Sequence, residues 1–140
     1  MYPKQHALVS GVAVGAAAVM QGHPLPGVAA WVAVGTVAGV FVDVDHLPLA
    51  TIFKDKGGVV LSWLRRPHEA VANGRDLKED LDPDDDLLVH RLVAHLIVLA
   101  ILANLTAVHP LFVPAALGVA VHIAADIAWD FYQQDGFPYL

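Results

Sequence analysis

Two long uncharged runs constrain the fold of this chain more than any other feature. The first extends from Gln5 to Val42, 38 residues without Asp, Glu, Lys or Arg, and the second extends from Leu92 to Ala125, 34 residues. A helix needs roughly 20 apolar residues to cross a bilayer, with about 17 as the lower limit. Each run therefore has room for two short helices and a turn, which predicts an all-α integral membrane bundle of about four transmembrane helices.

Strong helix breakers place the turns within the two runs. The first run is interrupted at residues 21–27, which include two Pro and two Gly, and the second is interrupted between Asn104 and Pro110. In a single domain covering residues 1–140, the predicted helices span residues 5–21, 26–42, 86–108 and 110–132. The first two each contain a Gly-x-x-x-Gly motif, at 11–15 and 35–39, which lets helix backbones approach closely in lipid. We therefore expect these two helices to form a packed hairpin.

Most of the charge lies between the two runs. Eighteen of the 22 Asp, Glu, Lys and Arg residues fall between Asp43 and Arg91. Within the predicted loop 43–85, residues 58–66 predict a short helix at the membrane interface, with Trp63 at headgroup depth; a plain amphipathic loop helix is the alternative. Residues 74–86 predict an acidic linker. The net charge of −6 and the lack of a basic face argue against nucleic acid as a partner.

The basic residues predict the orientation in the membrane. Six of the eight Lys and Arg residues lie in the middle loop, and Lys4 precedes the first helix. The positive-inside rule then puts the loop and both termini in the cytoplasm, with the bundle in the cytoplasmic membrane and the lipid bilayer as its partner. Lys4 and the residues after it also fit a cleaved signal peptide, but the apolar run continues past the turn into a second helix. Four short helices leave room for a homo-oligomer.

Ionisable side chains are expected to meet at one end of this bundle, where the predicted helices begin or end. These residues are His6, Asp43, Asp45, His46, His90, His95, His122 and Asp126. Ionisable groups at the rim of a membrane bundle are costly, and they normally pair or bind something. Imidazoles and carboxylates are ligands of first-row metals, zinc above all, and the chain has no Cys to supply thiolates. The pattern therefore predicts a divalent metal site, with zinc favoured and the number of ions open.

Spacing along the helices refines this prediction. His122 and Asp126 are four residues apart, so they share a helix face and suit two ligands of one ion. His90 and His95 are five residues apart, which places them about 140° apart around the helix axis. They therefore serve two different ions, or His95 supports a ligand without binding the metal.

Several short motifs occur in an order that resembles a known family. They are QHALVSG at 5–11, DVDH at 43–46, HRLVAH at 90–95, HIAAD at 122–126 and GFP at 136–138. Together they resemble the YdjM-like family of membrane-bound, metal-dependent hydrolases, a family distantly related to zinc-dependent phospholipase C and P1 nuclease. The resemblance covers nearly the whole chain apart from residues 74–86. It implies a metal-dependent hydrolase whose site contains His6, Asp43, Asp45, His46, His90, His95, His122 and Asp126.

Two functions are compatible with these residues. In a hydrolase of a phosphoester, or of a phospholipid or lipid-linked substrate, His6, His90, His122 and Asp126 are the first expected ligands, and Asp43 and His46 would complete the shell of a second ion. Asp45 would then be the general base, and Arg91 would stabilise charge on the phosphoryl group. The alternative is a non-catalytic bundle that binds metal or haem. Haem would explain two histidines but not the carboxylates. An ion path is less favoured, because the ionisable residues gather at one end.

Overall fold

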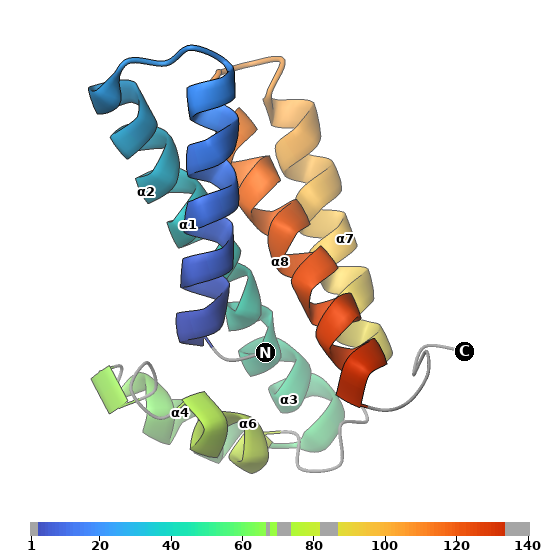
Figure 1. Ribbon diagram of the computed structural model, residues 1–140. Coiled ribbons are helices and arrows are strands. Elements are labelled where there is room, and N and C mark those ends of the chain that lie inside the picture. The colour runs from blue at the N-terminus through green and yellow to red at the C-terminus, as the bar shows by residue number, and fades with distance from the viewer. Residues whose placement is uncertain (1–2, 67, 70–73, 82–86, 134–140) are drawn as a thin grey trace.

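The structure is a computed structural model that describes residues 3–66, 68–69, 74–81 and 87–133. Four long helices lie side by side, and they are α1 (Pro3–Met20), α2 (Leu25–Phe41), α7 (Leu88–Leu105) and α8 (Phe112–Gln133) (Figure 1). They correspond to the four helices that the uncharged runs predict. The short elements η1 (Val42–Asp45), α3 (His46–Lys54), α4 (Gly57–Leu64) and α6 (Gly74–Leu81) gather at the end where α1 begins and α8 ends. The described residues contain no strand, so the all-α prediction is confirmed for them.

Three helical segments are long and apolar enough to cross a membrane: Leu25–Lys54, Leu88–Leu105 and Phe112–Tyr132. The first is 30 residues long because α2 continues through η1 into α3 with no break in the helix. Helix α1 is not among them: its first turn is polar, and its apolar part covers only residues 7–20. A short span of this kind falls below the usual lower limit of about 17 residues. Candidate membrane helices are therefore confirmed, whereas a fourth span remains a prediction.

The outer surface of the bundle is apolar, as expected for helices in lipid. His95 is the one buried residue of α7, and large apolar side chains such as Val93, Ile97 and Ile101 are about half exposed. A contiguous exposed apolar face usually marks a binding or membrane surface. The exposed side chains of α7 therefore support its assignment as a candidate membrane helix.

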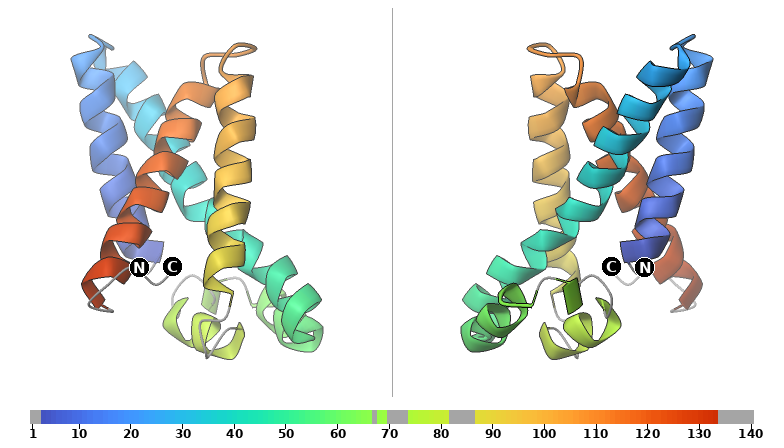
Figure 2. Two further views of the ribbon diagram at one scale, coloured as in Figure 1. Left: turned by 90° about the vertical axis from the view of Figure 1, so that its right-hand side faces the viewer. Right: turned by 90° about the vertical axis from the view of Figure 1, so that its left-hand side faces the viewer.

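Glycines allow α2 to pack tightly between α1 and α8, and the expected α1–α2 hairpin is confirmed. A Cβ atom on Gly35 would lie 2.6 Å from the Val14 side chain of α1 and 2.8 Å from the carbonyl oxygen of Pro114 in α8. A Cβ atom on Gly39 would lie 2.5 Å from Ser10 Oγ and 3.0 Å from the carbonyl oxygen of Gly118. Helices α2 and α8 cross at these glycines (Figure 2). Just beyond the crossing, the start of α1, the end of α2 and the second half of α8 lie close together.

The middle segment differs from its predicted description. Residues 74–81, expected to belong to an acidic linker, form helix α6, because Leu77 and Leu81 share one face and pack on α3 and α4. Residues 82–86 lie outside the described part of the chain. The predicted helix within 58–66 is present as α4. Its Trp63 is buried, however, and the indole Nε1 donates a hydrogen bond to Asp80 of α6 at 3.0 Å. Trp63 therefore joins α4 to α6 and does not lie against lipid headgroups.

Candidate metal centre

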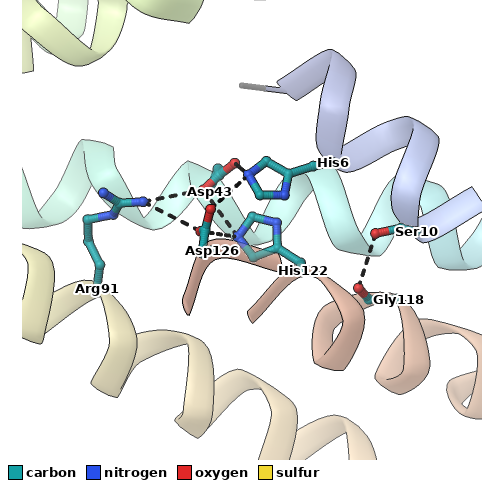
Figure 3. A network of polar contacts seen from close by, with 7 residues as sticks. All are labelled: His6, Ser10, Asp43, Arg91, Gly118, His122 and Asp126. Atoms are coloured by element: carbon teal, nitrogen blue, oxygen red, sulfur yellow. Dashed lines mark hydrogen bonds and ion pairs between the residues drawn. The ribbon is translucent and has the colours of Figure 1, made fainter. Parts of the chain in front are cut away.

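Four ionisable side chains from three elements meet at the end of the bundle beside the short helices. They are His6 of α1, Asp43 of η1, and His122 and Asp126 of α8 (Figure 3). One ligand atom from each lies within 4.8 Å of all the others. His122 and Asp126 share a helix face, as their spacing predicts. Asp43 is delivered by η1, in which the chain tightens directly after α2.

The two imidazoles face the two carboxylates across a short distance. His122 Nε2 lies 3.4 Å from Asp43 Oδ1 and 3.2 Å from Asp126 Oδ2. His6 Nε2 lies 3.2 Å from Asp126 Oδ1 and 3.9 Å from Asp43 Oδ2. The two rings stack with their centroids 3.9 Å apart. All four ligands therefore point toward one small volume.

This arrangement fits a divalent metal ion. Nitrogen and oxygen ligands bind such ions at about 2.0–2.2 Å, so donors around a tetrahedral ion are roughly 3.3–3.6 Å apart. The distances between imidazole nitrogens and carboxylate oxygens are 3.2–3.9 Å and involve both oxygens of each carboxylate, so the donors lie close to this spacing. His6 and His122 are 1% and 0% exposed, and among the described residues neither Nδ1 has a hydrogen-bond partner, whereas each Nε2 is paired with the carboxylates. An ion at the common point would replace these pairs as the partner of each Nε2.

Arg91 of α7 lies at the edge of this cluster. Its Nη2 atom is 3.9 Å from Asp43 Oδ1 and 3.8 Å from Asp126 Oδ2, which are ion-pair distances longer than a good hydrogen bond. A crevice between α7 and α8 reaches the same point, and its polar lining comes from Arg91, His95, Asp126 and Asp130. Arg91 therefore places a cation beside both carboxylates and in the lining of this crevice.

The remaining predicted site residues lie elsewhere or cannot be placed. His95 is buried, and the edge of its ring packs on His122 with centroids 5.0 Å apart, so it adjoins the cluster without belonging to it. His90 is exposed, and its ring packs against Phe53 of α3 at 4.6 Å. The structure therefore does not bring His90, an expected ligand, to the four-residue cluster: the 140° between His90 and His95 turns it away. The side chains of Asp45 and His46 lie outside the described part of the structure.

Two residues outside the predicted site, Ser10 and Gly118, join α1 to α8 beside the ligands. Ser10 is fully buried, and its hydroxyl donates a hydrogen bond to the carbonyl oxygen of Gly118 at 3.3 Å. Ser10 follows His6 by four residues, and Gly118 precedes His122 by four residues, so each lies one turn from a ligand. The sequence signal that could have identified them is a small residue, Ser or Gly, four positions from a predicted ligand.

The geometry favours a small ion over haem. A haem iron with two histidine ligands holds one imidazole on each face of the porphyrin. Here the two rings stack directly on each other, and both Nε2 atoms face the same carboxylates. No porphyrin fits between rings at this separation.

Comparisons with protein-family models, curated proteins and solved structures find no match for this chain. The fold and the site therefore define its class without help from relatives. It is a helical bundle with candidate membrane-spanning helices and a buried His/Asp group that can hold a metal ion.

Proposed function

We propose that this chain is a membrane-bound, metal-dependent hydrolase of phosphoesters, with zinc held by His6, Asp43, His122 and Asp126. The observation that carries the proposal is the convergence of four ligand atoms, all within 4.8 Å of one another, from elements far apart in sequence. The resemblance of the ordered motifs to the YdjM-like hydrolases supports the same chemistry. Two imidazoles and two carboxylates are a common donor set for zinc, which is why zinc is the proposed ion.

The surrounding residues suit the hydrolysis of an anionic ester. An ion held by these ligands supplies Lewis acidity, which lowers the pKa of water and polarises a phosphoryl oxygen. Arg91 supplies fixed positive charge for the phosphoryl oxygens, because its guanidinium lies beside both carboxylates but is not held by a short bond to either. From its place in the DVDH motif, Asp45 is the proposed general base.

The setting of the site suggests what kind of ester is bound. The crevice beside the cluster is lined by Arg91 and Asp126 together with apolar side chains of α7 and α8, including Leu92 and Ile123. Because both helices are candidate membrane spans, we propose that the phosphate belongs to a phospholipid or a lipid-linked substrate. We also propose that α1 is the fourth membrane helix, and that the ligand end of the bundle faces the cytoplasm because the basic loop lies there.

The first experiment is elemental analysis of detergent-purified protein, comparing the wild type with the double variant His122→Ala/Asp126→Ala. We expect about one zinc-type ion per chain in the wild type and none in the variant. His90→Ala is the matched control, because His90 is an imidazole at the same end that packs on Phe53 outside the cluster. Metal lost equally from the control and the double variant would argue against this ligand set. Absence of stoichiometric metal from the wild type, even after reconstitution with zinc, would end the proposal.

Metal content alone leaves a non-catalytic metal-binding bundle as the competing function. Zinc-loaded wild type, the double variant and His90→Ala would therefore be assayed on phosphomonoesters, phosphodiesters and phospholipid vesicles. Hydrolysis by the wild type and His90→Ala, abolished in the double variant, supports the hydrolase. Full loading without turnover on any phosphoester would leave metal binding as the function.

A further inference from the structure

Helix α1 is held in the bundle differently from the other three long helices. It is the one of the four that is not among the three candidate membrane spans, because its first turn contains Lys4, Gln5 and His6. Its place beside α2 and α8 therefore depends on contacts as well as on hydrophobicity. These contacts lie along one face, where Ser10, Val14 and Ala18 are fully buried.

The polar end of α1 is the costly part of this packing. His6 is 1% exposed, so docking of α1 removes its imidazole from water. Burial of a polar group is costly unless the group is paired. Its Nε2 lies 3.2 Å from a carboxylate oxygen of Asp126 and 3.9 Å from one of Asp43, which belong to α8 and η1. Two carboxylates and two imidazoles on three elements are thus brought together, and an ion shared among them joins all three.

We propose that the metal ion clamps α1 onto α2 and α8, so that occupancy of the site controls the docking of the N-terminal helix. The inference rests on the proposed metal site but not on any hydrolytic activity. A site assembled from separate elements is completed only when they dock, so the free energy of metal binding adds to the free energy of docking. An ion that binds only the docked form, supplied at 100 times its Kd, raises the docked-to-undocked ratio about 100-fold.

Because the chain contains no cysteine, single thiols can report the docking. Ala18→Cys is the reporter: Ala18 is 0% exposed and lies three turns from His6, too far to touch the ion. Ala16→Cys is the exposed control on the same helix. Ala50→Cys is the buried control, because Ala50 is 0% exposed in the cluster formed by α3, α4 and α6. Each variant is reacted with N-ethylmaleimide in detergent, with zinc chloride or with EDTA, and zinc content is measured on the same samples.

We expect zinc to slow the labelling of Ala18→Cys at least tenfold, toward the 100-fold limit, and to leave both controls unchanged. Adding His6→Ala to the reporter should abolish the effect of zinc, because α1 then contributes no ligand. If zinc binds stoichiometrically but does not slow the labelling of Ala18→Cys, the clamp is refuted while the metal site stands. If zinc slows labelling equally with and without His6, the effect does not pass through α1, and the clamp is again refuted. If zinc does not bind, the clamp and the proposed function both fail.

Discussion

The substitution Gly118→Ala tests whether the crossing of α2 and α8 sets the geometry of the metal centre. A Cβ atom at 118 would lie 2.9 Å from Gly35 Cα and closer still to the Gly35 carbonyl group. Carbon atoms in contact are normally about 3.5–4.0 Å apart, so the two helices must separate by roughly 1 Å. The obstacle is backbone and cannot rotate away. Overpacking of this kind costs about 1–3 kcal/mol of stability.

The same displacement reaches the ligands. His122 lies one turn beyond Gly118, about 6 Å along α8, and its Nε2 lies 3.4 Å from the carboxylate of Asp43 at the end of α2. Metal sites tolerate departures of only about 0.2 Å in ligand distance. We therefore expect zinc affinity to fall by about 10–100-fold, the range seen when groups that orient ligands are removed.

Two assays measure these effects. Unfolding of detergent-solubilised protein by increasing SDS gives the stability, and competition with a chromophoric chelator gives the zinc affinity. Gly58→Ala is the control, because no atom lies within 4 Å of its added Cβ; in helix α4 it should be neutral or stabilising by up to about 1 kcal/mol. Unchanged unfolding of Gly118→Ala would refute the close crossing. Destabilisation with unchanged zinc affinity would refute the coupling of the crossing to the site.

Three further substitutions separate the roles of neighbouring residues. Arg91→Gln should leave the zinc content unchanged, because Arg91 is not a ligand, while phosphoester hydrolysis falls by about 10²–10³-fold; loss of zinc would contradict this role. Trp63→Phe removes the hydrogen bond to Asp80 and should destabilise the docking of α4 on α6 by about 0.5–1.5 kcal/mol, seen as faster hydrogen exchange in both helices; unchanged exchange would argue against this contact. His95→Ala removes the ring that packs on His122 and should lower zinc affinity by about 10–100-fold. His95→Phe keeps an aromatic ring at this position and should lower zinc affinity less. Equal losses in the two variants would show that the imidazole itself matters.

The long helices could be predicted from the sequence because hydropathy and breakers act locally. Residues 21–27 end one helix and begin the next with Gly and Pro, and the structure turns there between α1 and α2. Helix α6 was missed because the acidic residues around it dominate the composition, whereas its formation depends on Leu77 and Leu81 packing against other helices. That packing is a tertiary contact, and composition does not report it.

The candidate site was partly predictable for the same reason. Helix ends could be assigned to one side of the bundle, so His6, Asp43, His122 and Asp126 were expected to be near one another, and the structure brings them together. Which of two histidines on one helix faces inward depends on how that helix is rotated about its axis. For α7, packing against α8 fixes this rotation, and it directs His95 inward and His90 toward Phe53.

The four-residue spacing from Gly118 to His122 and from His122 to Asp126 has a consequence for how this protein can change. A helix turns by about 100° per residue. Inserting or deleting one residue between Gly118 and His122 would keep the helix apolar and long enough, yet it would swing both ligands out of phase with the crossing. Compensation would require a matching shift in α2. Length changes in this part of α8 should therefore be far less tolerated than substitutions on its lipid-facing side. A scan of single-residue insertions and deletions would test this dependence on helix rotation directly.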